Sequence, residues 1–224
     1  MVKHAIILTA GKSLYLDGKN KVLIRHPLTR ETIMDSLISA FSGKKITVVV
    51  GFGALQVMED YPQLDYIIND RWATTNNAMS LGLALSKVTE PTYVVSGDMF
   101  FDRDLITAMD KGPANLVLTE NRENRTLTSI HCELDEEGVV QETYLGPIRS
   151  AHHPETAGLF KVSDERLRDS WHKQSLRHGN LFIAQTLPCH QESVFKAFDL
   201  GRHYFREVNS IADYWRLIEE GRSA

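Results

Sequence analysis

The sequence predicts an α/β protein with a mixed, mostly parallel central sheet and helices on both faces. Short continuous apolar runs, each ended by a turn residue, recur through residues 1–120 and are typical of strands buried on both faces. Segments with apolar residues at helical spacing separate these runs, and such alternation forms the βαβ units of a parallel sheet. After residue 120 the pattern changes to runs that favour antiparallel strands.

The first 120 residues supply the predicted parallel part of the sheet. The helix that ends at Phe41 is indicated by apolar residues at positions 33, 34, 37, 38 and 41. The predicted strands are Ala5–Leu8, Ile46–Val50, Tyr66–Ile68, Tyr93–Val95 and Leu116–Leu118, and the predicted helices are Thr32–Phe41, 77–88 and 104–110.

Residues 121–224 are expected to complete the same domain, because the pattern shows no linker, repeat or low-complexity segment. The segment 135–138, Asp-Glu-Glu-Gly, predicts a hairpin turn. Further predicted elements are strands at Leu127–Leu134, Gly138–Tyr144, Thr156–Val162, Val194–Phe198 and Tyr204–Val208, and helices at 164–187 and Ile211–Glu220. We therefore expect a single domain over residues 1–224.

Composition limits the classes of partner. The chain has 224 residues, 42% of them hydrophobic, enough for one sizeable core. Its formal net charge of -4, with Lys and Arg scattered, argues against nucleic acid as a partner. Cys132 and Cys189 stand outside any CxxC pair and suit a reduced protein. Apolar runs are too short for a signal sequence or a membrane span, so we expect a cytoplasmic protein.

The loop Thr9–Ser13 is the first candidate site, because ligands of parallel sheets bind beyond the carboxyl ends of the strands. Small residues there allow backbone N–H groups to approach a polyphosphate, and Lys21 lies at the end of the loop. An ordinary strand-to-helix turn with a solvated lysine explains the same residues. The spacing excludes a Walker A loop, and Gly51-Phe52-Gly53 lacks the third glycine of a dinucleotide fingerprint.

Three further segments carry candidate polar groups. Asp98 follows a predicted strand and a glycine, which suits a Mg²⁺ ligand, although a turn or helix cap uses the same residue. Asn76 and Asn77 offer paired donors and acceptors for a nucleobase edge, and one of them also suits a helix cap. Asn209 is either a cap beside Ser210 or a second metal ligand.

Taken in order along the chain, these segments resemble the sugar-nucleotidyltransferase-like family. The opening Ile6-Ile7-Leu8-Thr9-Ala10-Gly11-Lys12-Ser13, followed by Asn20-Lys21, resembles the family's Leu-Ala-Ala-Gly and Pro-Lys segments. Gly97-Asp98 resembles its metal aspartate, and the segment 156–160, Thr-Ala-Gly-Leu-Phe, resembles a later strand on its acceptor side. The segment 207–213, Glu-Val-Asn-Ser-Ile-Ala-Asp, resembles its final motif. The segment 69–81, with Asn76-Asn77 before Ser80, is similar to the CTP:phosphocholine cytidylyltransferase branch, which includes enzymes that activate phosphonates.

The resemblance implies a Rossmann-like nucleotide-diphospho-sugar transferase (GT-A-like) fold, with a nucleotide-binding half at 1–120 and an acceptor-binding half at 121–224. It implies transfer of CMP from CTP to a small phosphate or phosphonate acceptor, with Mg²⁺ as cofactor. The implied catalytic residues are Lys21 and Asp98, and the implied metal ligands are Asp98 and Asn209. The implied nucleotide-binding residues are Leu8, Thr9, Ala10, Gly11, Lys12, Ser13, Asn69, Asn76, Asn77, Ser80 and Gly97. Aromatic and acidic residues suited to a cationic acceptor give a predicted acceptor set of Trp72, Tyr144, Glu155 and Trp171.

The chain also departs from the family pattern. Leu14, Tyr15 and Leu16 stand where the family has its signature arginine region, Asn20 replaces a proline, and Asn209 replaces a second metal aspartate. These departures keep three alternatives open: a sugar-1-phosphate nucleotidyltransferase, a nucleotide-binding relative without catalysis, and a glycosyltransferase. The sequence does not decide between a monomer and a homodimer.

Overall fold

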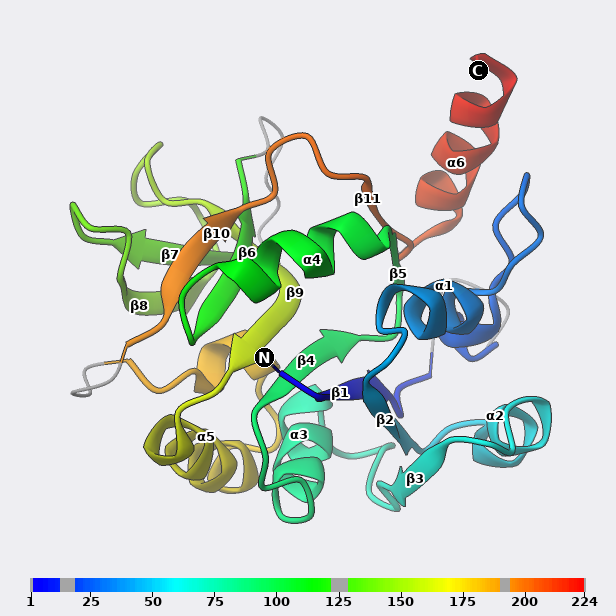
Figure 1. Cartoon of the computed structure of the whole chain (residues 1–224), viewed down its shortest axis with the longest axis horizontal. Coiled ribbons are helices and arrows are strands. Elements are labelled where there is room, and N and C mark those ends of the chain that lie inside the picture. The colour runs from blue at the N-terminus through cyan, green and yellow to red at the C-terminus, as the bar shows by residue number, and fades with distance from the viewer. Residues whose placement is uncertain (1, 13–18, 122–128, 190–193, 224) are drawn as a thin grey trace.

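The computed structural model describes residues 2–12, 19–121, 129–189 and 194–223 and has the predicted α/β architecture (Figure 1). In the described residues the main sheet has nine strands. Its central path runs β10 (Lys196–Asp199), β6 (Leu116–Glu120), β9 (Glu155–Val162), β4 (Thr92–Ser96), β1 (His4–Thr9), β2 (Lys45–Val50) and β3 (Asp65–Ile68). A hairpin of β7 (Ile130–Leu134) and β8 (Val140–Leu145) joins it through β9.

Most of this sheet is parallel, as predicted. β1 pairs in parallel with both β2 and β4, β3 pairs in parallel with β2, and β10 pairs in parallel with β6. Within the described sheet β9 and β8 run against this direction, whereas β7 pairs antiparallel with both of them and so runs with the parallel strands. Because β9 lies between β4 and β6, the second half of the chain completes the sheet begun by the first. The register of His4 opposite both Lys45 and Thr92 brings the carboxyl ends of β1, β2 and β4 to one edge.

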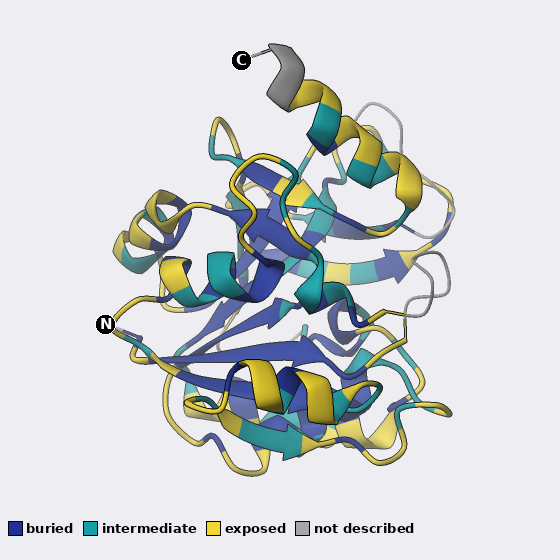
Figure 2. Ribbon diagram, turned by 90° about the vertical axis from the view of Figure 1, so that its right-hand side faces the viewer, coloured by how far each residue is buried: buried dark blue, intermediate teal, exposed yellow. Residues whose placement is uncertain are grey.

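Helices cover both faces of the sheet, because successive strand residues point to opposite sides. Within β1, Ile7 packs in a cluster with the helices α1 and α4, whereas Ile6 packs in another cluster with α3 and α5. Buried residues accordingly fill the sheet and the inner sides of the helices, and exposed residues mark their outer sides (Figure 2). The helices are α1 (Ile33–Ala40), α2 (Ala54–Asp60), α3 (Asn77–Leu85), α4 (Arg103–Lys111), α5 (Glu165–Arg177) and α6 (Ile211–Ser223).

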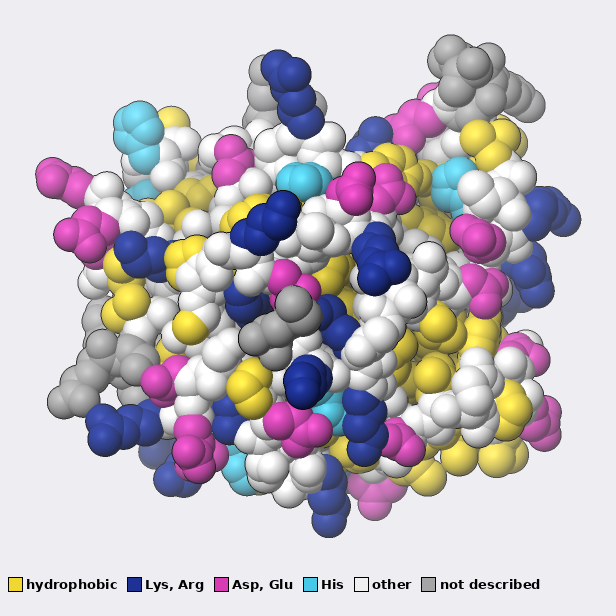
Figure 3. Space-filling model, in the orientation of Figure 1, with side chains coloured by type: hydrophobic (Ala, Val, Ile, Leu, Met, Phe, Trp, Pro, Cys, Tyr) yellow, Lys and Arg dark blue, Asp and Glu magenta, His cyan; other side chains and the backbone are white. Residues whose placement is uncertain are grey.

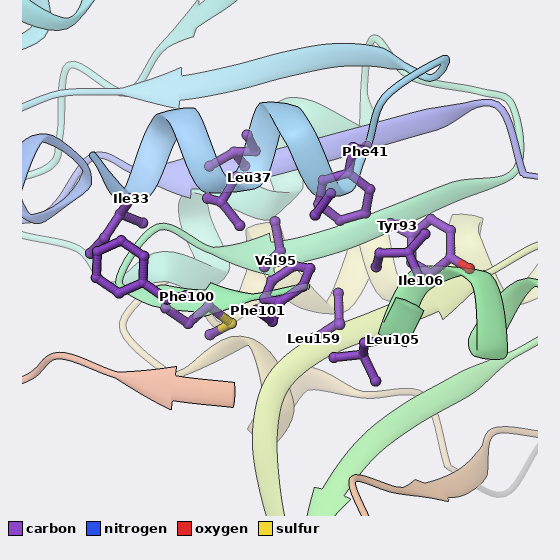
Figure 4. Packing of buried hydrophobic residues seen from close by; sticks show 14 of the residues in the cluster. Ile33, Leu37, Phe41, Tyr93, Val95, Phe100, Phe101, Leu105, Ile106 and Leu159 are labelled. Carbon is purple, nitrogen blue, oxygen red and sulfur yellow. The ribbon is translucent and has the colours of Figure 1, made fainter. Parts of the chain in front are cut away.

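Aromatic rings fill the space between the sheet and α1 (Figure 4). Phe41 contacts Tyr93 with ring centroids 5.5 Å apart and meets Phe101 edge-on at 5.9 Å. Phe101 belongs to β5 (Met99–Phe101), which pairs antiparallel with β11 (Phe205–Glu207). This packing fixes the short β5–β11 ribbon on the α1 side of the molecule, directly after the end of β4.

Three features differ from the sequence prediction. The helix predicted over 164–187 ends at Arg177, and the short 3₁₀ helix η2 (Ile183–Thr186) follows a turn. The segments α2 and β5 were not predicted, because α2 buries only Val57 and β5 is held by a partner strand distant in sequence. Leu127, where a strand was predicted to start, lies outside the described residues.

The surface shows no gathering of one charge sign on the face in Figure 3, where basic and acidic side chains are interspersed among the described residues. Among these residues, no helix combines the length and apolar character needed to cross a membrane.

Candidate functional site

The site begins where the ends of β1 and β4 are packed tightly together. The backbone N–H of Gly97 donates to the Leu8 carbonyl at 2.8 Å. A Cβ at position 97 would lie 2.9 Å from the Thr9 Cβ and 3.1 Å from the Leu8 oxygen, so this close approach requires glycine. Gly97 therefore turns the chain sharply at the end of β4 and presents Asp98 at the carboxyl edge of the sheet.

Lys21, Asp98 and Asn209 meet at this edge. Lys21 opens the 3₁₀ helix η1 (Lys21–Leu23), and its Nζ donates to Asp98 Oδ2 at 3.1 Å and to Asn209 Oδ1. The two charged side chains are mostly shielded, with 23% of Lys21 and 18% of Asp98 exposed. Three residues that are widely separated in sequence, and that were predicted as catalytic residues or metal ligands, thus lie together in one cluster.

A backbone hydrogen bond fixes Asp98 and Asn209 relative to each other. The Asp98 carbonyl accepts a hydrogen bond from the Val208 N–H at 2.7 Å, directly before Asn209. The cap of α6 is made by Ser210, whose hydroxyl accepts from the Asp213 N–H at 3.3 Å while Asp213 Oδ2 accepts from the Ser210 N–H at 2.8 Å. Because Ser210 makes this capping box, the side-chain oxygen of Asn209 is directed to Lys21 instead.

The donor set at this edge fits a hard divalent cation such as Mg²⁺. Asp98 Oδ1 is buried and receives no hydrogen bond from the described residues, although a buried carboxylate oxygen normally has a partner. Asp98 and Asn209 offer one carboxylate and one amide oxygen, and Mg²⁺ commonly takes one or two protein oxygens, with phosphates and water completing its shell. No cluster of three or more His, Cys, Asp or Glu side chains suited to a metal occurs in the described part of the chain.

The loop after β1 lies beside an aromatic pair. Lys12 Nζ stands 5.4 Å from the centroid of Phe52, and Phe52 meets Trp72 edge-on at 5.3 Å. The backbone N–H of Phe52 donates to the Ala10 carbonyl at 2.9 Å. Trp72, predicted to contact the acceptor, packs against Gly51 at the end of β2, and β2 and β9 lie on opposite sides of β1 in the sheet. Ser13 and the residues 14–16 of the missing arginine region lie outside the described residues.

The nucleotide-binding residues predicted in the segment 69–80 form two pairs, Asn69 with Ser80 and Asn76 with Asn77. Asn69 is only 1% exposed, and its amide donates to Ser80 Oγ at 3.1 Å and accepts from the Arg71 N–H at 3.0 Å. Asn69 and the buried Ser80 therefore shape the turn before α3, which corrects the prediction that they contact nucleotide directly. Asn76 accepts from the Asn77 N–H at 2.8 Å as the cap of α3, and Asn77 Oδ1 accepts from the Ile183 N–H at 2.9 Å. Both amide nitrogens remain without a hydrogen bond to the described residues.

The predicted acceptor residues on the β9 side have different environments. Glu155 begins β9, partly exposed, opposite Glu120 at the end of β6. Tyr144 is only 6% exposed, its hydroxyl lies 3.0 Å from His153 Nδ1, and the Arg149 guanidinium covers its ring at 4.0 Å. Trp171 is fully buried, and its Nε1 donates to Thr186 Oγ1 at 3.1 Å. Trp171 is therefore a core residue, and its prediction as an acceptor contact is wrong.

Comparisons with known proteins find similar folds among solved structures only. The sequence matches no family model and no curated protein. Among solved structures, the CTP:phosphocholine cytidylyltransferase from Streptococcus pneumoniae is similar with a TM-score of 0.75 and 18% identity, over 98% of this chain and 99% of that one. The inositol-1-phosphate CTP transferase from T. maritima has a TM-score of 0.71 at 17% identity, covering 97% and 96%. A nucleoside-diphosphate-sugar pyrophosphorylase from Vibrio cholerae RC9 also has a TM-score of 0.71, at 14% identity, covering 96% and 99%.

The chain has the Rossmann-like fold of these nucleotidyltransferases. The likeness extends over nearly the whole chain in each of the three cases. The structure also brings in one residue that the sequence analysis did not place at the site. Asn20 precedes Lys21, is 4% exposed, and binds the carbonyls of Thr9 and Phe52. The signals for it in the sequence were its place next to the candidate catalytic lysine and its replacement of the family's proline.

Proposed function

We propose that this protein is a Mg²⁺-dependent nucleotidyltransferase that transfers CMP from CTP to a small phosphate or phosphonate, releasing pyrophosphate. The observation that carries the proposal is the contact of Lys21 with both Asp98 and Asn209 at the carboxyl edge of the sheet. A lysine ammonium next to a carboxylate with an unsatisfied buried oxygen is suited to hold a polyphosphate and a metal together. The similar fold of the structures named above supports the same reaction class.

The residues have separate roles in this proposal. Mg²⁺, held by Asp98 and Asn209, would neutralise charge on the phosphates. Lys21 stabilises the negative charge that develops at the α-phosphorus, and the backbone of residues 10–12 binds the other phosphates. The acceptor oxygen is already an anion, so it attacks the α-phosphorus without a general base and pyrophosphate leaves in line. Catalysis then consists of positioning and charge neutralisation.

The two substrates are proposed to bind on opposite sides of β1 and β4. Asn76 and Asn77 lie at the start of α3 with free amide nitrogens among the described contacts, which suits the polar edge of cytosine. The acceptor is assigned to the β9 side, where Glu155 and Tyr144 lie at the same end of the β7–β9 region. A partly exposed carboxylate favours a cationic head group such as choline or an aminoethyl group.

Pyrophosphate release tests this function. Each nucleoside triphosphate is incubated with Mg²⁺ and one acceptor at a time: phosphocholine, 2-aminoethylphosphonate, a phosphorylated amino acid or a hexose 1-phosphate. We expect release with CTP and a cationic acceptor. Release only with a hexose 1-phosphate would assign the chain to sugar activation, and silence across the panel with nucleotide binding intact would contradict the enzyme proposal.

Substitutions at the cluster test the residue roles. Lys21→Ala and Asp98→Ala should each lower kcat by roughly 10²–10³, the usual effect of losing one contact to developing charge. Lys45 and Asp65 form a matched ion pair, also at 3.1 Å, but with more than half of each side chain exposed at the opposite edge. Lys45→Ala and Asp65→Ala should keep wild-type turnover, and full activity in Lys21→Ala would contradict the assignment.

A further inference from the structure

The side chain of Asn20 has every hydrogen-bonding position filled. Its Nδ2 donates to the carbonyls of Thr9 and Phe52, each at 3.0 Å. Its Oδ1 accepts from the Thr9 hydroxyl at 2.6 Å and from the Val22 N–H at 3.2 Å. An asparagine amide has two donors and two acceptor lone pairs, so nothing is left over. With only 4% of the residue exposed, each of these bonds is shielded from competing water.

These four bonds join three segments of the carboxyl edge. Thr9 is the last residue of β1, Phe52 lies in the loop after β2, and Val22 lies within η1. β1 and β2 are inner strands of the main sheet. The side-chain amide of Asn20 therefore fixes the start of η1 relative to these two strands. Lys21 is the first residue of η1 and lies between Asn20 and Val22. Because the side chain of Asn20 binds the sheet and also accepts from the Val22 N–H, the backbone of Lys21 is held on both sides.

Lys21 needs such an anchor, because its own side chain is flexible. A lysine carries its charge on four methylene groups, and its position is only as definite as the contacts that hold it. The ammonium group must reach Asp98 after β4 and Asn209 after β11, and both of these are fixed by the Asp98–Val208 backbone bond. The Lys21 ammonium group can keep both contacts only if the backbone of Lys21 stays in place relative to β1 and β4.

We propose that Thr9 and Asn20 form a hydrogen-bonded clamp that positions Lys21 against Asp98 and Asn209, with Asn20 as a positioning residue for the transfer reaction. The role in catalysis rests on the proposed function, whereas the positioning of Lys21 does not. The clamp acts through side chains, so it is sensitive to substitutions that keep the backbone: Thr9→Val removes one hydroxyl, and Asn20→Asp removes both donors while keeping the acceptor oxygen.

The reactivity of the Lys21 amine measures its positioning without any turnover. The full chain is acetylated briefly with acetic anhydride in the absence of ligand, and the modified peptides are quantified by mass spectrometry. The readout is the labelling of Lys21 divided by that of Lys45, whose ion pair with Asp65 lies elsewhere and is 61% exposed on the lysine side. Asp98→Asn gives the ratio for a lysine that has lost its anionic partner.

We expect Asn20→Ala and Asn20→Asp to raise this ratio roughly 3- to 10-fold, the factor that corresponds to weakening the one hydrogen bond from Lys21 to Asp98. Thr9→Val should raise it less, because the two bonds from Asn20 Nδ2 remain, and Thr9→Ser should restore the wild-type ratio. A wild-type ratio in a folded Asn20→Ala would overturn the proposal. If Asn20→Ala does not fold, a wild-type ratio in both Asn20→Asp and Thr9→Val overturns it.

Kinetics separate positioning from a merely structural effect. With the best substrate pair, Asn20→Asp should lower kcat roughly 10- to 100-fold while the KM for nucleotide changes less than about threefold. In a Lys21→Ala background the same substitution should have little further effect on kcat, because the clamp acts through Lys21. An equal loss in both backgrounds would contradict the clamp. Absence of turnover in the wild type would contradict the proposed function, and the labelling ratio would still decide on the clamp.

Discussion

Charge at single residues determines how strongly the site should hold a metal. Lys21 and Asp98 contribute opposite charges within 3.1 Å, and Asn209 contributes an oxygen without charge. The described cluster is therefore close to neutral, and a divalent ion gains little from it alone. Metal binding should depend mainly on the triphosphate, which brings several negative oxygens to the same place.

Asn209→Asp tests this view of the charge balance. The substitution keeps the oxygen near Lys21 and adds one negative charge to the cluster, so Mn²⁺ used as a probe for Mg²⁺ should bind about tenfold more tightly. Calorimetry of the protein with Mn²⁺, with and without CTP, measures the change. Asn209→Ala serves as the control and should weaken binding or leave it unchanged. Unaltered affinity in Asn209→Asp would place the metal away from this residue.

At the scale of elements, the approach of β1 and β4 depends on Gly97. Gly97→Ala places a methyl group 2.9 Å from the Thr9 Cβ, so one of the two strand ends must move. We expect a loss of about 1–3 kcal/mol in the free energy of unfolding, as in other overpacked sites, together with lower turnover because Asp98 shifts.

Urea unfolding of Gly97→Ala and Gly11→Ala provides the comparison. A Cβ at position 11 meets nothing within 4 Å among the described residues, so Gly11→Ala should change stability by less than about 1 kcal/mol. Equal losses in the two variants would show that packing at the end of β4 is not the cause.

Elements with local signals were the predictable ones. β1 and β4 are continuous apolar runs, and Thr32 forms a capping box with Asp35 at the start of α1, so strand and helix ends follow from nearby residues. β5 could not be predicted, because three residues become a strand only through pairing with β11. The turn after Arg177 was also missed, although Gly179 and Asn180 are residues that commonly follow the end of a helix.

In the candidate site, too, residues with a local sequence signal could be predicted, and residues that depend on distant contacts could not. Asp98 was predicted from its place after a strand, and Lys21 from its place at the end of the loop after the first strand together with the family resemblance; the structure brings the two within hydrogen-bonding distance. Trp171 was misassigned because an indole has the same sequence signal in a core as at a surface, and only its packing between Phe160 and Phe195 distinguishes the two. The clamp at Asn20 depends on the spatial meeting of Thr9, Phe52 and Val22, which sequence spacing does not reveal.

At the scale of the whole molecule, stability should fall at alkaline pH through Tyr61. This tyrosine is 8% exposed and donates to Asp35 Oδ1 at 2.9 Å, which links the end of α2 to the capping box of α1. Burial, together with the neighbouring carboxylates of Asp35 and Asp60, raises the pKa of Tyr61 to about 12 from its ordinary value of 10.0.

The direction of the pH effect follows from proton binding in the two states. Above pH 10 the unfolded chain loses the Tyr61 proton while the folded chain keeps it, so the free energy of unfolding decreases from pH 10 to about pH 12. Urea unfolding at pH 9, 10, 11 and 12 should show this decrease, and Tyr61→Phe should reduce its slope, because phenylalanine has no proton to lose. The variant starts from a lower stability at pH 9, since it also lacks the bond to Asp35, so the comparison rests on slopes. Identical slopes in the two proteins would assign the alkaline loss to other groups, first among them the buried Tyr93, whose pKa is also raised by burial and by Asp110.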